Sequence, residues 1–211
     1  MKHLNNIIFL TIIFNIAFIG CSSRSVITDP NTSIISSLDE ITKNNNNKAQ
    51  IAKILPKKIG NMELFKVADY TKRIIIGPDL GYGISYDLKN NRKGSGVIFL
   101  YKRYKKHVED GLSNDALTEL KAERRTIEKT DTNNAAFSKV NIRNIQFYKM
   151  KFFTPPDVNN EQYDCYLFIT GYNGVYLKVL FYYPANSKFG EEETGFFMNS
   201  LVMALNNHPV K

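Results

Sequence analysis

Residues 163–183 read YDCYLFITGYNGVYLKVLFYY. The apolar runs on either side, Tyr163 to Gly171 and Val175 to Tyr183, are rich in aromatic and β-branched residues and predict two strong strands. Asn173-Gly174 lies between them, and these two residue types adopt the positive φ angles that a tight two-residue hairpin needs. The stretch therefore predicts an antiparallel hairpin, which is typical of an antiparallel sheet.

The strand pattern continues upstream of this hairpin. Four further stretches alternate or run apolar as strands do: Met62 to Tyr70, Leu80 to Leu88, Ser95 to Tyr101 and Ile142 to Phe153. Residues 97–100 are continuously apolar, which suits a central strand covered on both faces. Residues 130–141 are polar, and we expect a loop there.

Two stretches predict helices. Ser113 can cap a helix that runs to about residue 129, and Asp115 lies in its first turn, where negative charge is favourable. We expect its buried face to carry Leu117, Leu120 and Ile127, and its solvated face to carry Glu119, Lys121, Glu123 and Arg125. Residues 191–193 open a second helix, whose predicted buried stripe is Phe197, Leu201, Ala204 and Leu205.

The predicted order is strand-strand-strand-helix, repeated once. This order predicts a single α/β sandwich domain of the α+β type over residues 56–206, with an antiparallel sheet of about six strands sandwiched by helices. Residues 207–211 are expected to form a tail. The 12 Tyr and 14 Phe supply large buried areas for the core. Cys165 is expected to be buried as a small apolar residue.

The N-terminal stretch Met1 to Cys21 predicts export. A positive start is followed by an apolar run, Ile7 to Ile19, that is too short to span a hydrocarbon core of ~30 Å, so residues 1–20 read as a signal peptide. Phe18-Ile19-Gly20-Cys21 resembles the lipobox of bacterial lipoproteins. That resemblance implies cleavage between Gly20 and Cys21, a diacylglycerol on the Cys21 thiol and palmitate-type acylation. The alternative is an ordinary secreted protein.

Residues 21–55 are expected to be a lipidated polar tether. Short helices are predicted near residues 34–41 and from Ala49 to Leu55, where Pro56 ends the second one. The alternative is that this segment packs on the domain. Ser22 and Ser23 do not resemble the Asp-type inner-membrane retention signal of lipoproteins, which favours the outer membrane facing the periplasm of the bacterial cell envelope.

The element order, the basic charge and the Leu80-to-Tyr101 meander followed by a helix at 113–129 resemble the Mog1/PsbP-like group, which includes the bacterial DcrB lipoproteins. The resemblance covers roughly residues 56–206. It implies an α/β sandwich used for binding and assembly, usually without catalysis, and it carries no catalytic residues to positions in this chain.

The net charge of +8 favours anionic partners. The densest basic run lies in Tyr101-Lys102-Arg103-Tyr104-Lys105-Lys106-His107, and Lys102, Arg103, Lys105 and Lys106 are the candidate residues for an anionic lipid or polymer surface. The alternative is a solvated loop. Nucleic acid is disfavoured because the export signal removes the chain from it.

The sequence predicts no metal, cofactor or catalytic set. After the signal only His107 and His208 remain, and Gly83-Ile84-Ser85-Tyr86-Asp87 lacks the second glycine of a nucleophile elbow. Residues 157–161 begin like a calcium loop but lack its later Gly and Glu.

We therefore expect a membrane-anchored envelope lipoprotein that acts as a non-catalytic binding or assembly protein. Two alternatives stay open: a small-ligand carrier with an aromatic-lined pocket, and a hydrolase that uses Asp69 or Asp87. An envelope protein is a further possible partner, and the oligomeric state is left open.

Overall fold

The computed structural model describes residues 46–70, 81–88, 94–103, 105–127, 137–154, 161–185 and 187–207. Its elements, in chain order, are α3 (Asn47–Ile54), β1 (Lys58–Ile59), β2 (Met62–Asp69), β3 (Tyr82–Leu88), β4 (Ser95–Tyr101), α4 (Asn114–Ile127), β5 (Phe137–Ile142), β6 (Ile145–Phe153), β7 (Tyr163–Tyr172), β8 (Val175–Pro184) and α5 (Gly190–Asn207). The fold class is α+β, as predicted.

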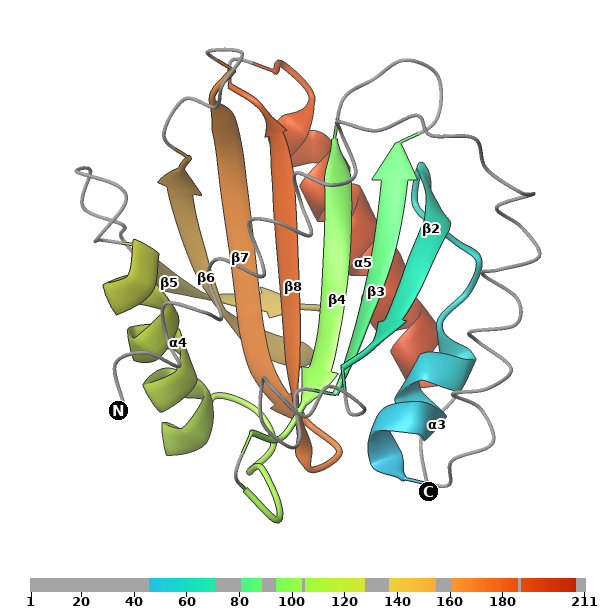
Figure 1. The fold of residues 1–211 in the computed structure, drawn as a ribbon, viewed down its shortest axis with the longest axis vertical. Coiled ribbons are helices and arrows are strands. Elements are labelled where there is room, and N and C mark those ends of the chain that lie inside the picture. The colour runs from blue at the N-terminus through green and yellow to red at the C-terminus, as the bar shows by residue number, and fades with distance from the viewer. Residues whose placement is uncertain are drawn as a thin grey trace.

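The strands form one open antiparallel sheet in the order β1-β2-β3-β4-β8-β7-β6-β5 (Figure 1). Each half of the sheet is a four-stranded meander followed by a helix, α4 after the first and α5 after the second. The halves meet where β4 pairs with β8, with Ile98 opposite Val179. The two halves of the chain thus have the same order of elements, and they join at the middle of the sheet through β4 and β8.

The sheet has eight strands, and the prediction of about six was wrong. The two missed strands, β1 and β5, are the edges of the described sheet. β1 has only two residues, and β5 is exposed along most of its length. An edge strand needs neither length nor a continuous apolar face, so periodicity does not detect it. The strand expected from Ile142 to Phe153 is therefore β6 alone, preceded by a tight turn at Arg143 and Asn144.

The hairpin predicted at Asn173-Gly174 is confirmed. Asn173 has φ of 50° and Gly174 has φ of 74°, as a two-residue turn of this kind requires. The loop before α4 docks on the same hairpin, because Gly111 and Gly171 exchange backbone hydrogen bonds of 2.9 and 3.1 Å. A Cβ on Gly171 would lie 1.8 Å from the carbonyl oxygen of Glu109, so this close approach requires glycine.

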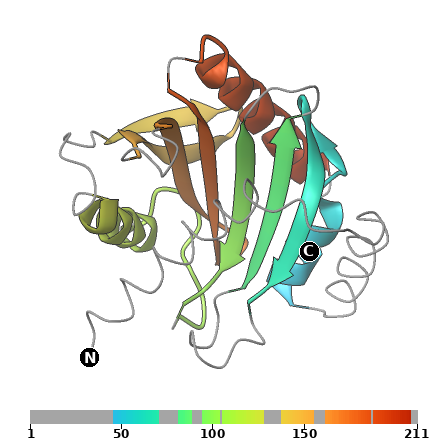
Figure 2. The same cartoon turned by 45° about the horizontal axis from the view of Figure 1, so that its top comes forward.

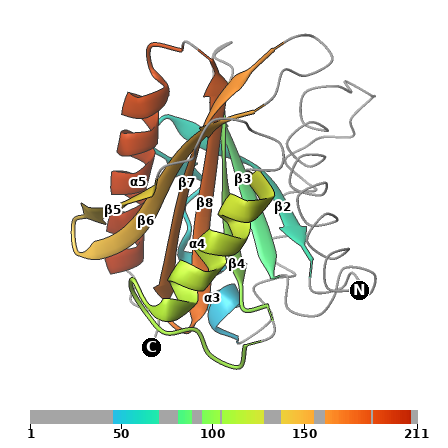
Figure 3. The ribbon, with the colours of Figure 1, turned by 90° about the vertical axis from the view of Figure 1, so that its left-hand side faces the viewer.

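Helices cover both faces of the sheet. α3 and α5 pack on one face, together with Tyr166 and Phe168 of β7, whereas α4 packs on the other, together with Cys165 and Leu167. Figure 3, a side view, shows α5 along one side of the sheet and α4 toward the other. α4 stands over β6 and β7, away from β2 and β3 (Figure 2). The expected burial of Cys165, which is 3% exposed, is confirmed.

Edge-to-face aromatic rings fill the space between the sheet and α5. Five rings from five elements follow one another with centroid distances of 4.9–6.3 Å: Tyr86, Phe197, Phe181, Phe168 and Phe147. Such pairs add to the gain from apolar burial because the positive ring edge meets the negative ring face. The predicted buried face of this helix is confirmed at Phe197, Leu201 and Leu205, while Ala204 is half-buried.

The helix predicted from Ala49 to Leu55 forms as α3 and packs on the domain. The Asn46 side chain caps it by accepting from the Ala49 N–H at 2.9 Å. Ala49, Ile51 and Ala52 are fully buried in the core below α5. The folded part therefore begins before residue 56. The C-terminal end of the segment expected to be a tether, residues 47–54, packs on the domain instead, as the alternative prediction had it.

Several predicted features lie outside the described residues. They are the signal peptide with Gly20 and Cys21, the helix near residues 34–41, Tyr104, residues 157–160 and His208. Within the described part of the chain, no helix is both long and apolar enough to cross a membrane.

Candidate functional site: a buried ionic cluster beneath α4

A cluster of five polar side chains lies between α4 and the middle of the sheet. Tyr101 ends β4, Arg103 follows it, Glu119 and Glu123 come from α4, and Lys178 comes from β8. Lys178 is 0% exposed, and the two glutamates are 4% and 6% exposed. Charged groups are almost never buried to this extent unless they are paired, so this ionic cluster is the first place to look for function.

Local structure explains why these side chains converge. Glu119 and Glu123 are one helical turn apart, so both project from the face of α4 that turns toward the sheet. Lys178 lies between Leu177 and Val179, whose side chains enter the core on the α5 side. Because side chains alternate along a strand, Lys178 must point to the α4 side. β8 and α4 thus bring Lys178 and Glu123, which carry opposite charges, next to each other in the space between the sheet and the helix.

The contacts are short and reciprocal. Lys178 Nζ donates to Glu123 Oε1 at 3.0 Å. Arg103 donates to Glu119 Oε1 from Nη2 at 2.7 Å and from Nε at 3.0 Å, and its Nη2 also lies 3.4 Å from Glu123 Oε1. The Tyr101 hydroxyl donates to the same Glu119 oxygen at 2.6 Å. Two cations therefore neutralise two carboxylates within the cluster.

Aromatic rings complete the surroundings of the cations. Lys178 Nζ lies 5.0 Å from the ring centroid of Phe99 and 5.3 Å from that of Tyr101. The guanidinium of Arg103 lies 5.9 Å from the Tyr101 centroid. Each distance is within the range at which a ring face attracts a cation. The rings stabilise the buried charge and shield it from water.

The pKa shifts of two members of the cluster favour a neutral Tyr101 phenol and a charged Arg103 guanidinium. Burial raises the pKa of the Tyr101 phenol well above its ordinary value, and Glu119 raises it further, so Tyr101 stays a donor. Burial would lower the pKa of Arg103, but Glu119 and its neighbours raise it above its ordinary value. Burial raises the pKa of Glu119, and the guanidinium of Arg103 opposes that rise. This arrangement can clamp α4 to the sheet.

The prediction that Glu119 and Glu123 are solvated was wrong. They are buried because Arg103 and Lys178, which lie far away in the sequence, supply the opposite charges. A signal was present, since positions 116, 119, 120, 123 and 127 follow the spacing of a single helix face. Three of these are the apolar residues Ala116, Leu120 and Ile127, so the two glutamates share a buried stripe.

The structure separates the four predicted anion-binding residues. Arg103 turns inward to the ionic cluster, and Lys105 pairs with Asp115 at the start of α4. Lys102 Nζ donates to the Lys106 carbonyl at 3.1 Å, and Lys106 is exposed. Two of the four charges are thus engaged with carboxylates. Anion binding by this loop stays a prediction.

The two aspartates considered for catalysis lie at different places in the sheet. Asp69 is opposite Tyr82 and Asp87 is opposite Glu63, so about five residues of β3, or ~17 Å, separate their positions. Burial raises the pKa of Asp87, against the effect of the Ser95 hydroxyl, which donates to it at 2.5 Å. The structure does not bring Asp69 and Asp87 into one site.

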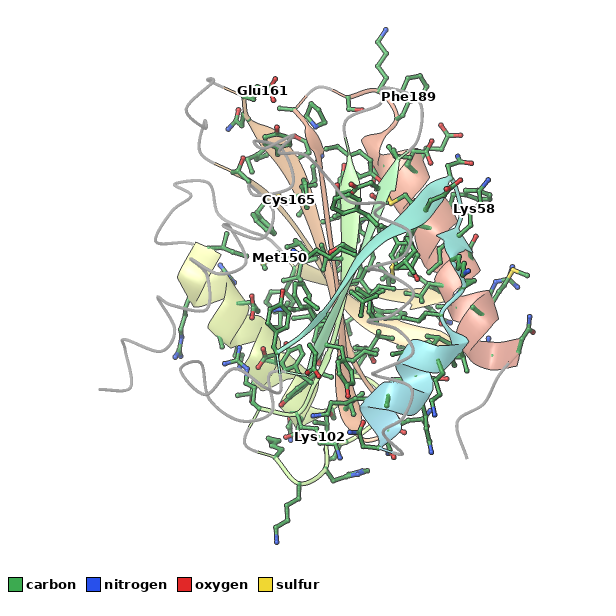
Figure 4. All side chains as sticks on the ribbon, turned by 45° about the vertical axis from the view of Figure 1, so that its right-hand side comes forward. Lys58, Lys102, Met150, Glu161, Cys165 and Phe189 are labelled. Atoms are coloured by element: carbon green, nitrogen blue, oxygen red, sulfur yellow. The ribbon has the colours of Figure 1, made fainter. Side chains whose placement is uncertain are left out.

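An apolar stripe runs along the outer face of α5. Phe189, just before the helix, Phe196 and Met203 follow one another at intervals of seven residues and are 48%, 51% and 45% exposed. Residues seven apart lie on the same side of a helix. Figure 4 shows Phe189 at the upper end of the molecule. We call these three residues the α5 stripe.

Among the described residues, no group of His, Cys, Asp and Glu side chains could hold a metal ion. Compared with known proteins, the chain matches no family model, no curated protein and no solved structure.

Proposed function

We propose that this chain is a lipid-anchored protein of the bacterial cell envelope whose domain binds or helps to assemble other envelope components without catalysing a reaction. The α5 stripe carries the proposal. Its three large apolar side chains are all close to half exposed; Phe196 and Met203 lie on α5, and Phe189 directly precedes the helix at the same interval of seven residues. Contiguous exposed apolar surface on a folded domain is typical of a protein-binding site, and a stripe of this period suits a groove or a second helix.

Two features of the interior support a binding role over the alternatives. The ionic cluster satisfies its own charges, so its carboxylates and cations are engaged in fixing the position of α4 on the sheet. The chain of five rings fills the space between the sheet and α5, which is where a carrier of small apolar ligands would need a cavity.

The family part of the proposal is a Mog1/PsbP-like sandwich related to the DcrB lipoproteins. It is supported by the repeated order of an antiparallel meander followed by a helix and by helices on both sheet faces. The anchor part is acylation of Cys21 after cleavage behind Gly20, with the domain held at the outer membrane and facing the periplasm. It is supported by the lipobox-like Phe18-Ile19-Gly20-Cys21.

In-cell photocrosslinking from the α5 stripe tests the binding role. A photoreactive residue at Asn199, which is exposed on α5 between Phe196 and Met203, should capture a defined envelope protein. The adduct should disappear when Phe196→Ser and Met203→Ser are introduced, because the apolar contact is lost. Lys121→Ser with Arg125→Ser, exposed on α4, is the matched control and should leave the adduct intact. An adduct that survives the α5 double variant contradicts the role of the stripe.

Acyl labelling tests the anchor separately. Wild-type protein should incorporate labelled palmitate and migrate as a processed form, whereas Cys21→Ala should stay unlabelled and uncut. Cys165→Ala is the control, since that thiol is buried and should not be the acylation site. Processed and labelled Cys21→Ala protein would refute the lipobox interpretation.

A further inference from the structure

The turn between β7 and β8 consists of Asn173 and Gly174, and the sequence Asn-Gly occurs nowhere else in the chain. Such a pair can react with itself. The glycine nitrogen attacks the side-chain carbonyl carbon of the asparagine, because no Cβ on the glycine obstructs the approach. The bond to the side-chain nitrogen breaks, and that nitrogen leaves as ammonia with the proton of the glycine N–H. Water then opens the resulting succinimide ring to aspartate or to isoaspartate, whose main chain runs through Cβ.

The fold holds the peptide group between Asn173 and Gly174 at both of its ends. Asn47, the first residue of α3, donates from Nδ2 to the Asn173 carbonyl at 2.8 Å. The Gly174 N–H donates to Oδ1 of Asp110, in the loop before α4, at 3.1 Å. A peptide group is planar, so its carbonyl and its N–H turn together. The two contacts therefore fix the rotation about the bond between Cα and the carbonyl carbon of Asn173.

The conformation of this turn opposes ring closure. The φ angles of Asn173 and Gly174 are 50° and 74°, and two positive values indicate a type I′ turn. In such a turn ψ of the first central residue is about +30°. The Gly174 nitrogen then lies away from the side chain of Asn173, on the other side of the Cα–C bond from its Cβ. Closure requires the peptide group to rotate, and this rotation breaks the contacts with Asn47 and Asp110.

The loop before α4 packs against the same turn. The Gly174 carbonyl accepts from the Val108 N–H at 3.1 Å, and Gly111 bonds to Gly171 just before the turn. A Cβ on Gly174 would lie 2.7 Å from Nδ1 of His107, so the loop leaves little room above the turn. Figure 1 shows the β7–β8 turn at the lower end of the sheet, beside this loop. The hairpin, the loop and α3 thus meet at one place.

We propose that Asn173 is a site of spontaneous deamidation, which the folded protein suppresses through Asp110 and Asn47. The carboxylate of Asp110 acts in two ways. It accepts the N–H whose proton must leave, and its negative charge opposes the charge that the attacking nitrogen of Gly174 acquires. This chemistry depends on neither the proposed anchor nor the α5 stripe.

The products weaken the contacts that suppress the reaction. Isoaspartate adds one carbon to the main chain of the turn, so the geometry that Asn47 and Asp110 recognise is lost. Either product also places a second carboxylate near Asp110, and like charges repel. Deamidation therefore makes permanent what begins as a transient opening of the contact between the hairpin and the loop.

Peptide mapping by mass spectrometry of the purified full chain, incubated at mildly alkaline pH, tests the inference. Asn173 should convert at least about tenfold more slowly in the native protein than in urea. Asp110→Ala should accelerate the native reaction by about tenfold or more, the factor expected for loss of one hydrogen bond to a charged group. Asn47→Ala should accelerate it about threefold to tenfold, because its bond joins neutral groups. Native conversion as fast as in urea, or unchanged rates in both variants, would overturn the inference.

Two controls separate a local effect from general unfolding. Glu109→Ala removes an exposed carboxylate next to Asp110 and should leave the rate unchanged. Asp110→Asn keeps an oxygen that can accept the Gly174 N–H but removes the charge, so its rate should lie between those of wild type and Asp110→Ala. Conversion at Asn199, which precedes Ser200 in α5, reports unfolding of the whole domain. Equal acceleration at Asn173 and Asn199 would overturn the role of Asp110.

Hydrogen exchange tests the consequence of the reaction. Deamidated molecules carry one more negative charge and can be separated from unmodified protein by ion exchange. The amides of Val108 and Gly111, which donate to the hairpin, should exchange faster in the deamidated fraction. The same exchange in both fractions would overturn the statement that the product weakens the contact.

Discussion

Lys178 is a full charge at the centre of a buried strand. Removing a charge from water is unfavourable, and the loss is recovered only if partners of opposite sign and good geometry replace the water. Glu123 and the rings of Phe99 and Tyr101 supply that replacement. The cost of burying the pair and the gain from its attraction nearly cancel, so the pair defines where α4 sits more than it stabilises the fold.

Substitution of Lys178 separates these two roles. Lys178→Met alone should lower the free energy of unfolding by about 3–5 kcal/mol, because a buried carboxylate loses its main partner. Adding Glu123→Leu should restore most of that loss, since apolar side chains then fill the space. Urea denaturation of the two single variants and the double variant gives the coupling energy directly.

Lys121→Met is the control for loss of a lysine, because Lys121 is exposed on the same helix and should change stability by less than about 0.5 kcal/mol. A double variant no more stable than Lys178→Met would show that the ion pair stabilises the fold by more than its apolar replacement does.

At this scale the sequence predicts single buried apolar residues well and buried charges poorly. Cys165 and Phe197 were placed correctly because their own chemistry decides their position. Glu119 was misplaced because its burial depends on Arg103 and Tyr101, whose proximity is a property of the folded chain.

The start of α4 is an element held by local electrostatics. The Ser113 hydroxyl accepts from the Ala116 N–H at 3.3 Å, and Asp115 in the first turn pairs with Lys105. The hydrogen bond from Lys105 lowers the pKa of Asp115 below its ordinary value. The carboxylate also interacts favourably with the positive end of the helix dipole.

Asp115→Asn should weaken this start in a pH-dependent way. A carboxyl whose pKa is lowered by folding stabilises the fold at neutral pH, and this contribution is lost as the pH falls through the folded pKa. We expect the variant to be less stable by about 0.5–1 kcal/mol at pH 7. The difference should shrink to nothing between about pH 5 and about pH 2.

Thermal unfolding of wild type and variant over this pH range is the measurement, with Asn114→Ala as a control that removes a neighbouring polar side chain without a charge. A difference that stays constant with pH would assign the effect to shape and not to charge.

Most elements could be predicted from the sequence, because strands and helices with a buried face carry the corresponding period. β3, β4, β7, β8 and α5 are of this kind. β5 could not, because its exposed residues satisfy only the backbone pairing with β6. Hydrophobic periodicity also does not predict the order of the strands across the sheet, because the pairing of β4 with β8 depends on the topology of the whole domain.

The whole molecule depends on contacts that join its two halves. Phe197 of α5 touches Tyr86 of β3 at a centroid distance of 5.4 Å and Phe181 of β8 at 4.9 Å. The helix also contacts β1 and β5, the two opposite edges of the sheet. α5 therefore holds both meanders at once, and the domain should unfold as one unit.

Phe197→Ala should lower the free energy of unfolding by about 3–5 kcal/mol, the usual cost of emptying a large aromatic site. Hydrogen exchange should then accelerate equally in β3 and in β7, because both halves lose the same contact. Phe196→Ala, one position earlier and 51% exposed, should leave exchange unchanged. Acceleration confined to one half would show that the meanders unfold independently.

The junction between β4 and β8 also governs when the chain can fold during its synthesis. Ile98 emerges from the ribosome about eighty residues before Val179, its partner across the junction. Until residues 175–184 have been made, β4 lacks β8, its neighbour on one side. The first meander therefore ends in an unpaired strand. A nascent chain of this design cannot complete its sheet until synthesis is nearly finished, which is compatible with the proposed export of the chain before it folds.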